Sequence, residues 1–310
     1  MKAVVLVGPT AVGKTELSLA LAGDLCEIIS ADSVQVYRYL DIGSGKPSAA
    51  QRSAVRHHLI DVVAPDYAFT AGDYLREARK ASDDIGRNNR IPLFVGGTGL
   101  YIDSFFQGLS DIPPVSPETR SRLSSELEEH GLGHLYGELQ ACDPQFAGVI
   151  HPNDRQRILR GLEVYRETGK PLSGYFGAKK GMGTGQTLYI GLAMDRHELH
   201  RRIGHRVDGM MRNGFLDEVA RLREMGYGPG LNSMKSIGYA ELNRYLDGGL
   251  GLEEAVELIK TQTRRYAKRQ MTWFGKNRQI QWFDFFEVEK IRNVMYGWSD
   301  TSENAAGERF

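Results

Sequence analysis

The first 110 residues alternate between short apolar runs and segments with helical spacing. Apolar runs that predict β-strands lie at 3–8, 26–30, 57–62 and 91–97. Between them, 14–25 and 71–87 carry apolar residues at the spacing of amphipathic helices. This rhythm predicts a parallel α/β sheet covered by helices. Ligands of such sheets bind beyond the carboxyl ends of the strands, so the residues after each strand are the functional candidates.

After residue 114 the pattern becomes helical, with no strand-like alternation from 115 to 170. Helix starts are predicted at Ser116, which is a capping residue, at Asp143, and near Asn153 and Asp154. The glycine-rich stretch 173–187 predicts a flexible loop. A strand at 188–195 then resumes the α/β pattern, so the helical segment is predicted to be an insertion.

The simplest organisation is a discontinuous core of 1–114 and 188–298 around a helical insertion, 115–187. The second part of the core is predicted to be helical over 196–275, with a last short strand at 279–284. The polar tail, 299–310, is expected to be disordered.

Composition narrows the class of protein. No apolar run approaches the roughly 18 residues that span a bilayer, and 3–8 is too short for the core of a signal peptide. Cys26 and Cys142 lie far apart without a C-x-x-C pattern, which argues against a disulfide framework or a thiolate zinc site. We therefore expect a cytoplasmic protein with no membrane partner.

The charge distribution is more informative than the net charge. Lys and Arg total 39 and are balanced by 39 Asp and Glu, which argues against a uniformly basic nucleic-acid-binding protein. Residues 260–278, however, contain seven Lys or Arg and no Asp or Glu. Such a block fits a phosphate-rich partner or a solvated helix face, and the pattern leaves both open.

A phosphate-binding motif, G-x-x-x-x-G-K-[ST], follows the first predicted strand and precedes a predicted helix. The loop comprises Gly8, Pro9, Thr10, Ala11, Val12, Gly13, Lys14 and Thr15. Its backbone N–H groups bind oxyanions, Lys14 neutralises them, and the Thr15 hydroxyl is a candidate Mg²⁺ ligand. This chemistry requires a diphosphate and does not require a nucleoside.

The carboxylate that usually completes a nucleoside triphosphatase is missing from the expected place. Such enzymes carry an Asp after a further apolar strand, whereas 91–95 leads into Gly96 and Gly97. Asp61 follows only two apolar residues, and Asp195 is better explained as a helix N-cap. The triphosphatase interpretation is weakened.

Polar side chains follow the other strands. Asp32 comes after 26–30, a strand we expect to pair with the phosphate-loop strand, and is a candidate general base or the start of an Asx-turn. Thr98 is a candidate site hydroxyl or the cap of a helix beginning near Gly99. Arg202 and Arg206 share a helix face as a candidate second phosphate clamp or as solvated surface.

Three nearby histidines do not predict a metal site. The histidines in this segment are His197, His200 and His205. No carboxylate or cysteine accompanies them at a suitable ligand spacing.

The ordered motifs resemble those of one family. They are "GPTAVGKT", "ISADSVQVYRYLDIGSGKPS", "HHLIDV", "VGGTGLY", "HPNDRQRILRGLEVYRETGKPLS", "NGFLDEV", "SIGY" and "YAKRQMTWF". From Val7 to about Asp284 the chain resembles the bacterial tRNA dimethylallyltransferases, also called tRNA isopentenyltransferases, of the IPP transferase family. The resemblance implies a P-loop NTPase-like core with parallel strands and a small helical insertion.

The resemblance also implies an activity. Such enzymes transfer the dimethylallyl group of dimethylallyl diphosphate to N6 of adenosine 37 in tRNA, with Mg²⁺ and release of diphosphate. By this resemblance, Asp32 is the catalytic base, Thr98 is a catalytic-site hydroxyl near the transferring group, and Arg206 is a diphosphate ligand. Departure of an allylic diphosphate fits a phosphate loop that lacks a water-activating carboxylate.

A tRNA surface is implied in the same way. The implied tRNA contacts are Asp32, Ser33, Val34, Gln35, Arg120, Gln156, Arg157, Ile158, Leu159 and Arg160. The insertion would hold the anticodon stem-loop, and 260–278 would follow the tRNA backbone. The segment 235–239 resembles a further tRNA-facing stretch, except that Ala240 stands where the family often has arginine. We expect a monomer.

Two other classes share the phosphate loop. A small-molecule or nucleoside kinase would use ATP as donor and Asp32 as the base for a hydroxyl. A phosphate-loop switch or RNA-binding ATPase would use the basic segment for RNA. Transfer of a prenyl label into tRNA distinguishes the first hypothesis from both.

Overall fold

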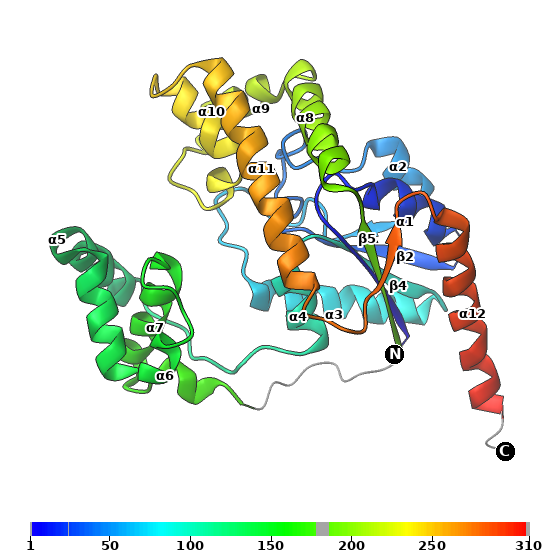
Figure 1. Cartoon of the computed structure of the whole chain (residues 1–310), viewed down its shortest axis with the longest axis horizontal. Helices are drawn as coiled ribbons and strands as arrows, with labels where there is room; N and C mark the ends of the chain where they lie inside the picture. The colour runs from blue at the N-terminus through cyan, green and yellow to red at the C-terminus, as the bar shows by residue number, and fades with distance from the viewer. Residues whose placement is uncertain (1, 24, 178–185, 308–310) are drawn as a thin grey trace. The chain divides into compact units, whose positions relative to one another are not determined.

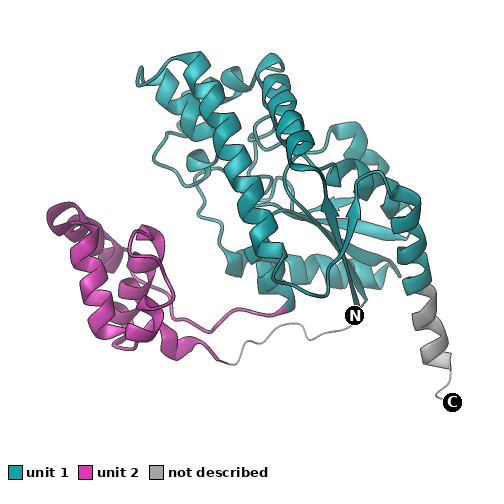
Figure 2. Cartoon of the chain, viewed as in Figure 1, with its two compact units in different colours: residues 1–106, 184–310 teal, residues 107–183 magenta. Residues whose placement is uncertain are grey.

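A computed structural model describes residues 2–23, 25–177 and 186–307, with the side chains of 300–307 left aside. The chain forms two compact units (Figures 1 and 2). Unit 1 comprises 1–106 and 184–310, and unit 2 comprises 107–183. The insertion predicted at 115–187 thus begins eight residues later than unit 2 does. Most of the loop predicted at 173–187 falls on 178–185, outside the described residues.

The described residues of unit 1 form a six-stranded parallel sheet in the order β3-β2-β4-β1-β5-β6. The strands are β1 (Ala3–Val7), β2 (Cys26–Ala31), β3 (His57–His58), β4 (Ile91–Gly96), β5 (Thr187–Ala193) and β6 (Gln281–Asp284). The predicted α/β class is confirmed. The expected pairing of β2 with the phosphate-loop strand is wrong, because β4 lies between β2 and β1.

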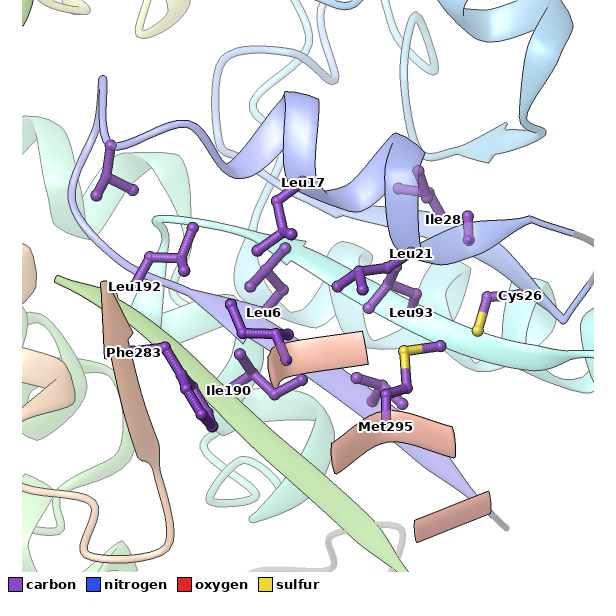
Figure 3. Packing of buried hydrophobic residues seen from close by; sticks show 14 of the residues in the cluster. Leu6, Leu17, Leu21, Cys26, Ile28, Leu93, Ile190, Leu192, Phe283 and Met295 are labelled. Carbon is purple, nitrogen blue, oxygen red and sulfur yellow. The ribbon is translucent and has the colours of Figure 1, made fainter. Parts of the chain in front are cut away.

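Both faces of the central strands β1, β2 and β4 are buried, which explains why these strands are continuous apolar runs. Val4 and Leu6 of β1 point into one core, while Val5 and Val7 point into the other. Helices α1 (Lys14–Ala22) and α12 (Val288–Gly307) supply residues to the first core, part of which Figure 3 shows. Helices α3 (Ala71–Arg87) and α4 (Gly99–Phe106) cover the opposite face (Figure 1).

A helical layer follows β5 within unit 1. Its elements are α8 (Arg196–Arg212), α9 (Phe215–Glu224), the 3₁₀ turn η2 (Ser233–Lys235), α10 (Tyr239–Leu246) and α11 (Leu252–Phe274). These helices share a core with the loop after β2, including Val36 and Leu40. The short helix α2 (Ala49–Ala54) follows that loop. The layer thereby places α8 and α11 near the residues that follow β2.

Unit 2 is helical, as its pattern predicts. It contains α5 (Pro117–Cys142), α6 (Pro144–Ala147), α7 (Arg155–Thr168) and the 3₁₀ turn η1 (Leu172–Tyr175). The predicted helix starts are confirmed: Ser116, Asp143 and Asp154 each accept a backbone N–H of the following helix. Gly131, with φ 76°, marks a kink where two helices meet within α5. Leu135 and Leu139 pack with Ile158 in the buried core of this unit.

The last helix corrects the expected disordered tail. Helix α12 continues to Gly307, so 299–307 are helical, while 308–310 lie outside the described residues. Ile291 and Met295 anchor its first half against the sheet. Adding residues to an existing helix avoids the cost of nucleation, which lets a polar sequence continue it. Among the helices that the structure describes, none is long and apolar enough to cross a membrane.

Candidate active site

The phosphate loop connects β1 to α1 at the carboxyl edge of the sheet. Its two motif glycines are required by close approaches. Gly8 has φ 148°, and a Cβ there would lie 2.7 Å from the carbonyl oxygen of Leu192. Gly13 has φ 108°, and a Cβ there would collide with the ring of Phe285. The loop can therefore keep its backbone N–H groups at the helix N-terminus only with glycine at both positions.

Lys14 lies over the loop from which it comes. Its Nζ donates hydrogen bonds to the carbonyl oxygens of Gly8 (2.9 Å) and Pro9 (2.8 Å). Burial lowers the pKa of Lys14 to about 8, Asp32 opposes the shift, and Arg206 adds to it. A cation destabilised in this way favours an anionic ligand, because the anion restores the charged form.

Arg206 is the arginine of α8 that faces this charge cluster. Burial lowers the pKa of its guanidinium, while Asp32 and Glu16 raise it. It approaches the backbone of Gly45 so closely that a Cβ on that residue would collide with Nη2. Arg202 points to other partners, with Nε 3.1 Å from Glu198 Oε1 and its guanidinium carbon 4.8 Å from the centre of the Phe285 ring. The structure therefore brings Arg206 to Lys14 and directs the charge of Arg202 elsewhere.

Asp32 follows β2 and begins a tight turn. Its Oδ1 accepts the backbone N–H groups of Val34 (2.8 Å) and Gln35 (3.3 Å), which is the Asx-turn that the sequence leaves open. Within the described part of the chain, no protein group is hydrogen-bonded to Oδ2. One oxygen thus fixes the carboxylate, and the other remains available as a proton acceptor.

Thr98 connects the ends of β4 and β2. Its N–H donates to the carbonyl oxygen of Ala31 (3.1 Å), and its Oγ1 accepts the N–H of Ser33 (3.0 Å). The hydroxyl therefore supports the turn that begins at Asp32 instead of capping α4. Because β4 lies beside β1, this bond places the Asp32 turn at the same sheet edge as the phosphate loop.

Two site residues on α11 were not identified from the sequence. Gln270 is 5% exposed and is hydrogen-bonded to Thr10 of the phosphate loop and to Gly97. Burial raises the pKa of the Tyr266 hydroxyl to about 12, and the side chains of Thr98 and Gln270 oppose this shift. Their spacing of four residues, within a quoted motif, was the available signal, since it places both on one helix face.

The other acidic candidates for a metal site have structural partners. Asp61 pairs with Lys46 (2.6 Å) and Arg52 (2.7 Å). Asp195 is an N-cap, as predicted, and accepts two backbone N–H groups at the start of α8. Within the described residues, no group of three or more His, Cys, Asp and Glu side chains could hold a metal ion. This statement includes the three histidines of α8.

The remaining predicted tRNA residues of unit 1 lie in the Asp32 turn. Gln35 Oε1 accepts the Ser30 hydroxyl (3.0 Å), and its Nε2 donates to the carbonyl oxygen of Gly45 (3.4 Å). Ser33 and Val34 are half-buried beside it. The turn is therefore held from both sides by polar contacts.

In unit 2, α5 and α7 bring two predicted arginines together. Arg120 Nε lies 3.9 Å and Arg160 Nη1 lies 3.6 Å from Glu163 Oε2. Arg157 instead pairs with the helix cap Asp154 (3.5 Å). Arg120, Arg157 and Gln156 are exposed, and Leu159 and Arg160 are half-buried. Ile158 is fully buried, so its side chain supports the core instead of offering a surface to tRNA.

The family model for IPP transferases matches residues 35–279. The chain belongs to the IPP transferase family. It is 48% identical over 295 residues to tRNA dimethylallyltransferase 1 of Syntrophotalea carbinolica, covering 94% of each chain. It is also 48% identical over 292 residues to tRNA dimethylallyltransferase 2 of Geotalea uraniireducens, covering 93% of each chain.

Solved structures agree with this membership. A tRNA isopentenylpyrophosphate transferase of Bacillus halodurans is 37% identical with a TM-score of 0.72, and the match covers 99% of each chain. A eukaryotic dimethylallyltransferase acting on tRNA is 30% identical with a TM-score of 0.80, and the match covers 98% of this chain and 80% of that one. The IPP transferase model begins after the phosphate loop, but the 99% structural match includes the loop.

Proposed function

We propose that this member of the IPP transferase family transfers the dimethylallyl group of dimethylallyl diphosphate to N6 of adenosine 37 in tRNA and releases diphosphate. One observation carries the proposal. The phosphate loop with Lys14 and Arg206 shares an edge of the sheet with the Asp32–Thr98 turn. Relatives named tRNA dimethylallyltransferase support it.

The basic side of the site suits a leaving group. As the bond between the allylic carbon and oxygen breaks, its electron pair remains with the diphosphate, whose charge increases. Lys14, Arg206 and the backbone N–H groups of the loop would stabilise that charge in partly desolvated surroundings. Their contribution grows in the transition state because the leaving oxygen gains charge there.

The Thr15 hydroxyl fits a Mg²⁺ ion. Mg²⁺ prefers oxygen ligands and keeps several water and phosphate ligands, so it needs few protein groups. Within the described chain, the structure gives this hydroxyl no hydrogen-bond partner, which leaves its oxygen available. A bound Mg²⁺ would supply further neutralisation of the diphosphate oxygens.

The acidic side of the site suits the acceptor amine. The N6 lone pair is delocalised into the adenine ring, so the amine is a weak nucleophile. Its lone pair forms the new bond to the allylic carbon, and an N–H proton moves to the free oxygen of Asp32. Thr98 holds the Asp32 turn through Ser33 and keeps the carboxylate oriented.

The acceptor base must leave the stacked anticodon loop to reach this edge. The loop is already single-stranded, so unstacking costs a few kcal/mol at most. The proposal assigns tRNA contacts to Ser33 and Gln35 in unit 1 and to Arg120 and Arg160 in unit 2. A cytoplasmic location belongs to the proposal because tRNA is the acceptor, and the monomeric state stays a prediction.

The kinase hypothesis is not favoured. A kinase would require further groups to hold ATP and its metal, and Asp61 and Asp195 both have structural roles. Labelled dimethylallyl diphosphate should transfer its label to unmodified tRNA, with diphosphate released in equal amount. Turnover of ATP with no label in the tRNA would contradict the proposal.

A further inference from the structure

Gln270 is a buried polar side chain that bridges two loops of the site. It lies on α11, and both ends of its amide are used. Oε1 accepts the backbone N–H of Thr10 in the phosphate loop at 2.8 Å. Nε2 donates to the carbonyl oxygen of Gly97 at 3.0 Å. A glutamine amide donates at one end and accepts at the other without carrying a charge.

The approach of α11 to the Gly97 loop is close. A Cβ on Gly97 would collide with Gln270 Nε2, and a Cβ on Gly99 would collide with the indole of Trp273. Glycine at these positions therefore permits the helix to reach the backbone between β4 and α4. This packing fixes the Gln270 amide, since the residue is 5% exposed.

Gln270 is also joined to the acceptor side of the site. Tyr266 lies one turn earlier on α11, and the side chains of Thr98 and Gln270 both lower the pKa of its hydroxyl, against the effect of burial. Thr98 accepts the N–H of Ser33, next to Asp32. Hydrogen bonds therefore run from Thr10 in the phosphate loop through Gln270 to Gly97. Gly97 precedes Thr98, which holds the turn that carries the carboxylate.

We propose that Gln270 is a positioning residue for prenyl transfer, which holds the phosphate loop and the Thr98 loop at a fixed separation. The inference rests on the proposed function. Its reason is geometric. The leaving diphosphate belongs to the phosphate loop, and the proton acceptor Asp32 belongs to the turn that the Thr98 loop holds through Ser33. Transfer requires the N6 amine, the allylic carbon and the leaving oxygen to be aligned. A displacement of about 1 Å between such groups costs on the order of 10²-fold in rate.

Two variants separate the bonds from the packing. Gln270→Met keeps the length and removes both hydrogen bonds. Gln270→Glu keeps an acceptor for Thr10 but donates to Gly97 only when its carboxyl group is protonated. Asp103→Ala is the matched control. It removes a neighbouring hydrogen bond between α11 and α4, from Trp273 Nε1 to Asp103 Oδ2 (3.0 Å), and leaves Gln270 intact.

The assay is prenylation of unmodified tRNA by each full-length variant, with kcat and both KM values measured and thermal melting used to confirm folding. We expect Gln270→Met to lower kcat by on the order of 10²-fold, with a change of under about threefold in the KM for tRNA. The ratio of Gln270→Glu to wild-type activity should rise as pH falls and the carboxyl group protonates. Asp103→Ala should keep kcat within about fivefold of wild type, as expected for a packing contact outside the bridge.

Three results would overturn the positioning role: wild-type kcat in Gln270→Met, an equal loss in Asp103→Ala, or a pH-independent ratio for Gln270→Glu. If the wild-type enzyme prenylates tRNA and Gln270→Met does so with the same kcat, only the positioning role of Gln270 is contradicted. A wild-type enzyme that transfers no label to tRNA would instead contradict the proposed function.

Discussion

The lowered pKa of Lys14 makes diphosphate binding depend on pH. Burial brings this pKa to about 8 in the free protein, with Arg206 contributing. A bound diphosphate places negative charge beside the ammonium group and raises its pKa again. Below pH 8 the free protein already carries the proton, so binding is strongest there. Above pH 8, binding must take up a proton from solvent, and affinity falls as pH rises.

The magnitude follows from the titration of one group. With a pKa of about 8 in the free protein and a return to the ordinary lysine value of 10.5 in the complex, the dissociation constant of dimethylallyl diphosphate should increase about tenfold between pH 7 and pH 9. At pH 9, binding should take up about 0.9 proton through Lys14. The ligand also titrates, so Lys14→Arg is the reference, because a guanidinium stays charged throughout this range.

Isothermal titration calorimetry with dimethylallyl diphosphate measures both quantities. Titrations at pH 7, 8 and 9, each in two buffers with different ionisation enthalpies, give the dissociation constant and the proton uptake. The wild-type protein should show the extra pH dependence and proton uptake, and Lys14→Arg should show only those of the ligand. Equal pH slopes in the two proteins would refute the assignment of the titration to Lys14.

Three further substitutions test the separate parts of the site. Asp32→Asn retains a side-chain oxygen that accepts the backbone N–H groups of the turn, but it removes the proton acceptor. The rate of single-turnover prenylation should therefore fall by about 10²–10⁴-fold while tRNA affinity is retained. A parallel loss of tRNA affinity would assign Asp32 a structural role. Arg160→Gln should weaken tRNA binding and reduce the slope of log affinity against log salt by about one, and an unchanged slope would mean that this arginine faces solvent. Gly45→Ala should displace Arg206 and raise the KM for dimethylallyl diphosphate by about tenfold, equivalent to roughly 1.4 kcal/mol of ligand affinity. Gly23→Ala is the control for backbone strain, because Gly23 has φ 44° and open space around it. An equal increase in KM in Gly23→Ala would exclude the collision with Arg206 as the cause.

Local signals in the sequence were sufficient for much of the fold. The motif Gly8–Thr15 required only a strand, a tight turn and a helix in succession, and all three lie next to one another in the chain. The caps Ser116, Asp143 and Asp154 were predictable because each bonds to backbone groups within three residues. Continuous apolar runs likewise indicated the central strands β1, β2 and β4, since both faces of these strands are buried.

Non-local contacts account for the rest. Which strand separates β1 from β2 depends on how the helices pack over the sheet, and the apolar runs of all these strands are alike. Gln270 is 260 residues from Thr10, and nothing beside either residue indicates the bond between them. Asp32 had two competing roles in the sequence, and only the structure shows that one oxygen makes the turn. The charge cluster around Lys14 is likewise assembled from residues distant in the chain.

The central claim is that the phosphate loop holds a prenyl diphosphate whose dimethylallyl group is transferred to tRNA. Mass spectrometry of nuclease digests, after incubation of the enzyme with an unmodified tRNA transcript and dimethylallyl diphosphate, tests it most directly. We predict that the fragment containing adenosine 37 gains the mass of one dimethylallyl group and that a transcript with guanosine at this position gains none. An unmodified adenosine 37, in the presence of Mg²⁺ and saturating donor, would contradict the account.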